Sequence, residues 1–464
     1  MKSSSLIRHS NRSPNPNHRI GNWIWTAALG LALSGFLTSS SEGEELIYFE
    51  PHTGFSEVVD TENPGKYATL PGPPHAVVRG SNPSRAGNLT FNVTYADVAM
   101  SNGIGFDDAS EGEIRRATAE AVLTYINDLL NETTGATIDV QFLESQTDGK
   151  KFLAAAGTFY AEVNGFSNGI AFLHITTGAD PSAGVVDIRV TVDFGWTWNS
   201  DQGTPAGGEF DLFSVLLHEY THGLGYVNLT DSAGNSEITF GNPGKYGIYA
   251  QLTEVDDGGT VGVGSSTAIW TGSGATASFS GLTSDLRENR LVFVGAKAVA
   301  AFGSNPRIYS PSSFSSGSSL SHWDPSVGTA VMRHFVSKGV EVRDYAPFEI
   351  AALVDLGYSS AAAGDSLDQN NPYVDFGAGS NGNGASISPF DNLADALSAA
   401  SIDNAIIHIA PGTSPEMFSG VEKIDQDVTL QNTTGLSSVL IGSDARRNAD
   451  GASSSGFVSR SRKE

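Results

Sequence analysis

The residues best suited to chemistry in this chain lie within Asp211–Tyr226, which reads DLFSVLLHEYTHGLGY. If this stretch is helical, His218 and His222 lie one turn apart on one face, with Glu219 beside them. Two neutral imidazoles can bind one zinc ion, and a neighbouring carboxylate can take the proton from a zinc-bound water. The spacing therefore predicts a zinc centre with Glu219 as its general base.

The same stretch carries the signals of a helix. Its apolar residues recur at helical spacing, and two glycines, Gly223 and Gly225, follow where the helix should end. The apolar positions are Phe213, Leu216, Leu217 and Tyr220. Two histidines at this spacing can also be hydrogen-bonded core residues. The glutamate directly after the first histidine and the Gly-Leu-Gly directly after the second favour zinc.

A zinc centre needs a third protein ligand, and the sequence offers several. Of the ten histidines, only His322, His334 and His408 lie beyond the helix, and His408 falls inside a strand pattern typical of a packed residue. A ligand three residues after Gly225 would be Asn228, whose amide is a poor zinc ligand. Glu254 is a carboxylate in an acidic, glycine-flanked stretch with a poor helical pattern. His322, Asn228 and Glu254 remain the alternatives.

Downstream of the helix the chain reads GSSLSHWD at residues 317–324 and VMRH at residues 331–334. With the HExxHxxG helix, this order resembles the leishmanolysin-like branch of the metzincin metallopeptidases, in which an insertion precedes a His-Trp ligand segment and a methionine turn. The resemblance covers roughly residues 86–360. The matching residues are His218, Glu219, His222, Gly225, His322 and Met332. The chain departs from the family in the Arg-His after Met332 and in having no cysteine.

The resemblance implies a zinc metalloendopeptidase with an α+β fold, in which a twisted sheet supports the zinc-binding helix. It implies His322 as the third ligand and Met332 as a packing floor beneath the metal. Substrate would bind along a sheet edge as an extra strand. His334 and Tyr226 are candidates for stabilising the oxyanion. The alternative is an extracellular adhesion or glycan-binding protein with a structural or inactive zinc site.

The elements that must position these residues follow from periodicity. Strands are expected where apolar residues alternate, at 91–95, 138–142 and 188–194. A helix is expected over 110–131, with a capping box from Ser110 and Glu113, and another from Pro347 to Gly357. The glycine- and serine-rich stretch 229–316 is expected to form turns and short strands. Residues 86–360 are therefore expected to form the metallopeptidase domain.

The chain begins with a pattern typical of export. Basic residues precede the apolar run Trp23–Leu37, and small residues follow it, so residues 1–41 are predicted to be a signal peptide. The protein is then secreted and not stably inserted in a membrane after cleavage; an uncleaved signal anchor is the alternative. Residues 42–85, which contain six prolines, are expected to be an extended lead-in or a propeptide.

The last hundred residues have a different pattern. A linker at 361–370 leads to short strands at fairly even spacing over 371–443, which are similar to the opening coils of a right-handed parallel β-helix. A solenoid of this kind needs about three repeats for stability, so the segment is expected to be partial. Residues 444–464 are polar and are expected to be disordered.

The composition of the chain limits the classes of partner that it is expected to bind. The net charge of −25 argues against nucleic acid and anionic membranes and leaves protein or peptide substrates. Without cysteine the chain can form no disulfide, although export would permit them. Beside Zn²⁺, Ca²⁺ is a weaker candidate in two acidic stretches, 256–259 and 365–371, for which solvated loops are the alternative. The oligomeric state is not indicated by the sequence.

Overall fold

The computed structural model describes residues 45–61 except 52 and 54, 68–69, 72–80, 88–256 except 151 and 202, 266–359, and short stretches between 372 and 440. The expected signal peptide (1–41), linker (361–370) and tail (444–464) lie outside the described residues. So do the expected calcium stretch 365–371 and residues 257–259 of the other.

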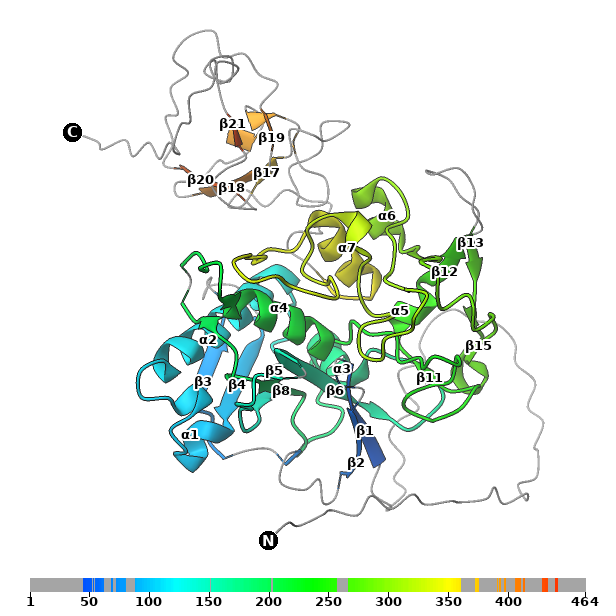
Figure 1. Ribbon diagram of the computed structural model, residues 1–464. Helices are drawn as coiled ribbons and strands as arrows, with labels where there is room; N and C mark the ends of the chain where they lie inside the picture. Colours follow the sequence, from blue (N-terminus) through cyan, green and yellow to red (C-terminus); the bar gives the residue numbers. More distant parts are fainter. Residues whose placement is uncertain are drawn as a thin grey trace. The chain divides into compact units, whose positions relative to one another are not determined.

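A seven-stranded mixed sheet forms the centre of the fold, in the order β2-β1-β6-β8-β5-β4-β3 (Figure 1). Its strands are β1 (Glu45–Glu50), β2 (Phe55–Asp60), β3 (Ala76–Arg79), β4 (Thr90–Tyr95), β5 (Thr137–Phe142), β6 (Ala154–Ala161) and β8 (Ile188–Val192). Strands β4, β5 and β8 run parallel, whereas β6 is antiparallel to both β8 and β1. The three strands expected from alternation are confirmed as β4, β5 and β8, the last ending at Val192.

Helices pack on this sheet and enclose the main core. The principal ones are α2 (Gly112–Leu130), α3 (Gly169–Thr177), α4 (Leu212–Gly223) and α7 (Pro347–Asp355). Helix α4 packs against β6 and β8, and α2 packs against α4 (Figure 1). The helix expected over 110–131 is confirmed as α2, but its expected capping box is wrong. The N-cap residue is Glu111, which makes no side-chain cap bond, and Asp108 accepts the N–H of Ser110 (2.8 Å) and of Glu111 (2.9 Å).

Residues 42–85, expected to be an extended lead-in or propeptide, contribute three of the seven strands. Both faces of β1 are buried. Leu46 and Tyr48 join one small apolar cluster with Phe159 of β6, and Ile47 and Phe49 join another with Tyr160. Because β1 pairs with β6 on the side away from β8, β6 has a neighbour on each edge. The sheet therefore extends well before residue 86.

The stretch 229–316 forms short elements between turns, as expected. These are β11 (Lys245–Tyr246), α5 (Ile248–Gln251), β12 (Thr253–Asp256), β13 (Ser266–Ala268), β14 (Trp270–Thr271), β15 (Ser278–Phe279), β16 (Leu291–Phe293) and α6 (Ala296–Phe302), with a 3-10 turn at Gly274–Thr276. Helix α6 packs against α7. The remaining short elements are α1 (Ala96–Met100), β7 (Gly165–Phe166), β9 (Trp198–Asn199), β10 (Phe210–Asp211) and 3-10 turns at Gly105–Asp107 and Pro325–Val327.

The strands that the structure describes in the C-terminal part of the chain lie in parallel pairs. They are β17 (Tyr373–Val374), β18 (Ala405–Ile409), β19 (Gly412–Thr413), β20 (Val428–Asn432) and β21 (Val439–Leu440). The order is β17-β18-β20 in one group and β19-β21 in another. Parallel stacking suits a β-helix, which stays a prediction for 371–443. None of the helices in the described part of the chain is both long and apolar enough to cross a membrane.

Candidate metal centre

Helix α4 carries the first two histidines and is fixed at its start by a buried carboxylate. Asp211 caps the helix, because its Oδ2 accepts hydrogen bonds from the backbone N–H (2.9 Å) and the hydroxyl (2.6 Å) of Ser214. The guanidinium of Arg343 pairs with the same carboxylate at 2.5 Å. At the other end Gly223 lies against β8, since a Cβ there would come within 2.7 Å of the Ile188 side chain. The glycine thus allows the helix to approach the sheet closely.

The structure brings His322 to the two histidines of α4. The Nε2 atoms of His218 and His222 lie 3.1 Å apart, and His322 Nε2 lies 3.2 Å and 3.1 Å from them. All three side chains are buried, with His322 fully so. Tetrahedral zinc with Zn–N bonds of about 2.0–2.1 Å separates its nitrogens by about 3.3–3.4 Å. The three imidazoles therefore lie at nearly the spacing of a tris-histidine zinc centre.

Each imidazole is oriented by a backbone carbonyl that accepts from its other nitrogen. The bonds run from His218 Nδ1 to Val331 O (2.8 Å), from His222 Nδ1 to Tyr226 O (2.9 Å) and from His322 Nδ1 to Ser318 O (2.7 Å). A carbonyl only accepts, so each Nδ1 carries the proton and each Nε2 presents a lone pair to the shared space. Burial also lowers the pKa of His218 to about 4, which keeps its ring neutral.

Glu219 lies beside the first histidine with 2% of its surface exposed. Burial raises the pKa of its carboxyl well above the usual range, and the charge of Glu50 raises it further. A hydrogen bond from the backbone of Ala156 in β6 acts in the opposite direction. The carboxylate is thus held between α4 and β6, and a cation bound at the three histidines would lower its pKa.

Glu349 holds together the segment that follows the third histidine, a role that was not expected from the sequence. Glu349, on the first turn of α7, is 1% exposed and accepts N–H groups from Trp323, Val331, Met332 and Ala346. Burial raises its pKa to about 7, while these N–H groups lower it. Met332 is fully buried. The glutamate three residues after Ala346 signals a helix cap, but its links to 323 and 331–332 have no local signal in the sequence.

Of the alternative third ligands, Glu254 does not join the histidines. Among the described histidines and carboxylates, the group whose ligand atoms lie within 4.8 Å of one another at this place consists of His218, His222 and His322. Asn228 is 1% exposed, and its backbone N–H donates to Ser321 Oγ at 3.1 Å. Glu254 lies on β12 and accepts from Ser266 Oγ at 2.5 Å.

The two candidates for oxyanion stabilisation lie in different surroundings. The ring of His334 stacks on Tyr309 at a centroid distance of 3.5 Å, and Tyr309 in turn pairs with the backbone of His322. This places His334 near His322, the candidate third ligand. Tyr226 is 1% exposed, and its ring packs against that of Tyr249 at a centroid distance of 4.6 Å. Its hydroxyl lies in the interior, and its role in oxyanion stabilisation stays a prediction.

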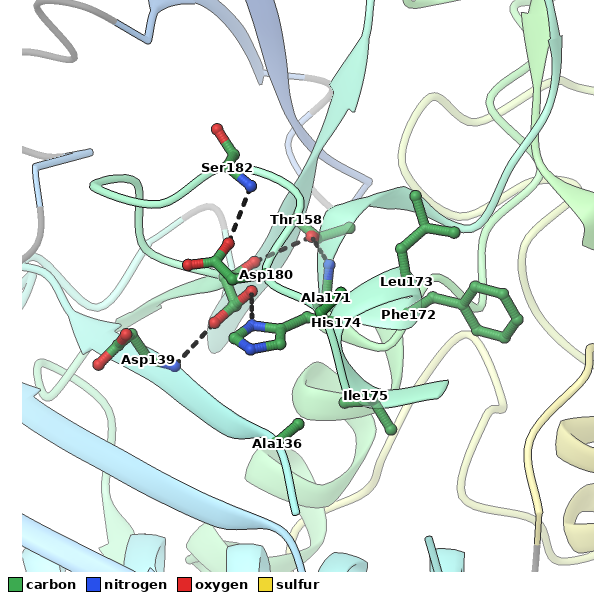
Figure 2. A network of polar contacts seen from close by, with 12 residues as sticks. Ala136, Asp139, Thr158, Ala171, Phe172, Leu173, His174, Ile175, Asp180 and Ser182 are labelled. Carbon is green, nitrogen blue, oxygen red and sulfur yellow. Dashed lines mark hydrogen bonds and ion pairs between the residues drawn. The ribbon is translucent and has the colours of Figure 1, made fainter. Parts of the chain in front are cut away.

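A second convergence of ligand-type atoms lies at His174, Asp180 and Asp187 (Figure 2). His174 Nδ1 lies 3.0 Å from Asp187 Oδ1, and the other oxygen of Asp187 accepts the backbone N–H of Asp139 at 2.8 Å. Asp180 is exposed and accepts the N–H of Ser182 at 2.8 Å. The buried pair is satisfied by these contacts and joins α3 to β5 and the start of β8.

A pocket borders the segment that carries the third histidine. Its walls include Phe49 of β1, Val227 and Leu229 after α4, and Ser319 and Ser321 just before His322. The wall is therefore partly supplied by the N-terminal strand. The wall combines apolar side chains and hydroxyls with the carboxyl group of Glu237.

Comparison with known proteins gave no match to a family model, a curated protein or a solved structure. The resemblance to leishmanolysin-like peptidases therefore rests on a few motif residues and on the order of elements. What the structure adds is the convergence of His218, His222 and His322 beside Glu219.

Proposed function

We propose that this protein is a secreted zinc-dependent endopeptidase. The observation that carries the proposal is the convergence of three Nε2 atoms, all within 3.2 Å of one another, beside the buried Glu219. Three protein ligands leave one coordination position for water or substrate, as in catalytic rather than structural zinc sites. Proteins or peptides are the proposed substrates.

The donor set favours zinc. All three ligands are imidazoles whose Nδ1 protons are held by carbonyls, so each Nε2 is neutral and directed at one point. Calcium and magnesium prefer oxygen ligands, whereas imidazole suits zinc. When bound, zinc lowers the pKa of its water and polarises the scissile carbonyl.

Glu219 would take the proton from that water and return it to the leaving amine. Its burial between α4 and β6 limits the positions that the carboxylate can adopt. Secretion is proposed from the basic and apolar leader, residues 1–41.

The rival function is an extracellular adhesion or glycan-binding protein with a structural zinc site. A structural site is closed by four protein ligands and has no use for a general base. The described residues supply three histidine ligands here, and Glu219 follows the first of them on α4. This composition favours catalysis.

Zinc content and casein hydrolysis, measured with and without a chelator, test the proposal. Glu219→Gln should retain zinc and lose about 100- to 10,000-fold in rate, because the base is removed while the ligands stay. Glu254→Gln is the matched control and should keep full activity, since Glu254 lies on β12 and accepts a hydrogen bond from Ser266 on β13. Zinc-loaded protein without chelator-sensitive hydrolysis would favour the rival function.

A further inference from the structure

One buried carboxylate gathers N–H groups from three separate segments of the chain. Glu349 Oε1 accepts from Met332 N at 2.8 Å and from Trp323 Nε1 at 3.1 Å. Its Oε2 accepts from Val331 N and from Ala346 N, both at 2.9 Å. Only Ala346 belongs to the start of α7, so capping this helix accounts for one of the four bonds.

The first link leads from Glu349 to His218 through a single peptide group. The peptide between Val331 and Met332 donates its N–H to Glu349 Oε1, and its carbonyl accepts from His218 Nδ1 at 2.8 Å. The carboxylate and the imidazole thus lie at opposite ends of one peptide dipole. A negative acceptor at the N–H end makes the carbonyl a stronger acceptor, which favours the Nδ1-protonated form of His218.

The second link leads to His322 through its neighbour. Trp323 is fully buried, its indole donates to Glu349, and its backbone N–H donates to Met332 O at 2.8 Å. The backbone on the C-terminal side of His322 is therefore held to the same methionine segment that orients His218. One carboxylate fixes the spacing between ligands that are 104 residues apart.

We propose that Glu349 is a positioning residue of the metal centre, acting on His218 through the Val331–Met332 peptide and on His322 through Trp323. This inference rests on the proposed metal centre. Outer partners of metal ligands typically contribute about 10- to 100-fold in metal affinity, because they fix the tautomer and direction of the ligand. A residue that acts only as a helix cap would affect folding stability and leave metal affinity unchanged.

The test compares Glu349→Gln with a control on the same helix. Glutamine keeps the size of the side chain but supplies one acceptor oxygen, so its NH₂ group faces N–H donors in either orientation. Asp355→Asn is the control, because Asp355 accepts the backbone N–H groups of Lys297 (3.1 Å) and Ala298 (2.9 Å) at the other end of α7. Each variant removes a side-chain oxygen that accepts backbone N–H groups. Only Glu349, however, is linked to the three histidines.

Zinc affinity by chelator competition and the absorption spectrum of the Co²⁺-substituted protein are the readouts. We expect Glu349→Gln to lose about 10- to 100-fold in zinc affinity and to change the Co²⁺ spectrum, while Asp355→Asn changes neither. Equal zinc affinity and an unchanged spectrum in folded Glu349→Gln would overturn the proposal.

A second variant keeps the proposal testable if Glu349→Gln does not fold. Trp323→Phe removes the indole N–H and leaves the peptide link to His218, so we expect a smaller loss of zinc affinity with an altered Co²⁺ spectrum. Wild-type affinity in this variant would refute the link to His322. Wild-type protein that binds no zinc would instead refute the proposed function, which separates the two failures.

Discussion

Gly225→Ala is predicted to damage the metal centre by moving the turn that follows its helix. Gly225 has φ +88°, and a Cβ there would lie 2.2 Å from the carbonyl oxygen of Asn168. That neighbour cannot yield, because Asn168 is buried and its side chain bonds to Leu356 O at 3.2 Å and to Ile248 N at 3.1 Å. The turn must therefore shift, and with it the carbonyl of Tyr226 that orients His222.

The loss of unfolding free energy in Gly225→Ala has two parts, which can be separated by comparison with a second glycine. Gly303 has φ +83° and also follows a helix, but nothing lies within 4 Å of its Cβ position. Gly303→Ala should cost only the left-handed conformation, roughly 1–2 kcal/mol. Gly225→Ala should add about 1–3 kcal/mol for the overlap with a fixed backbone. The effect of alanine on the unfolded chain is common to both and cancels in the comparison.

Urea denaturation of the metal-free proteins gives the two free energies of unfolding. Zinc affinity, measured by chelator competition, shows whether the damage reaches the ligands. We expect Gly225→Ala to be the less stable variant and the only one with weakened zinc binding. Equal destabilisation of the two variants, or wild-type zinc affinity in Gly225→Ala, would refute the steric reasoning.

Three further predictions concern the ligands, pH and the domain boundary. His322→Ala should weaken zinc binding by more than the roughly 10- to 100-fold that is typical of outer partners. His334→Ala removes a ring that stacks on Tyr309 and should leave the zinc affinity nearly unchanged. Comparable zinc affinities of the two variants in a chelator titration would reject His322 as a ligand. The metal-free protein should lose about 3 kcal/mol of unfolding free energy between pH 6.5 and pH 4, because the pKa of His218 is lowered to about 4 and the unfolded chain binds the proton first. Stability then rises with pH, and His218→Gln should flatten this slope in urea denaturation; an equal slope in both proteins would contradict it. A chain ending at Gly364 should fold and hydrolyse casein, since the described sheet and all three histidines precede it; an insoluble product would place the boundary elsewhere.

Periodicity predicted the elements whose contacts are local in sequence. The apolar stripe and terminal glycines of α4 are sufficient to place His218 and His222 on one face, and alternation is sufficient for β4, β5 and β8. The role of His322 came from resemblance, since no local pattern brings together residues 100 positions apart. Its place beside His222 depends on the whole insertion between them.

Strands and contacts that depend on distant partners were not predictable in this way. Strand β1 pairs with the nearby β2 on one edge, but it joins the main sheet through β6, more than 100 residues later, and the prolines of 42–85 concealed this. Glu349 has the local appearance of a helix cap, and its bonds to 331–332 appear only when α7 packs beneath the metal ligands. The failed cap at Ser110 shows the same limit at short range, because Asp108 accepts the N–H of Ser110 that the expected box assigned to Glu113.

Because His218 and His322 are 104 residues apart, a metal ion bound by both would also affect the stability of the chain. An ion held by both residues closes a covalent-like loop in a chain that has no cysteine with which to form a disulfide. For a disulfide, closing a loop of about 100 residues removes about 4.7 kcal/mol of chain entropy from the unfolded state. A peptidase is also a potential substrate for its own neighbours, and its unfolded copies are the ones that can be cut. The ion needed for hydrolysis would thus also protect each molecule from digestion by the others.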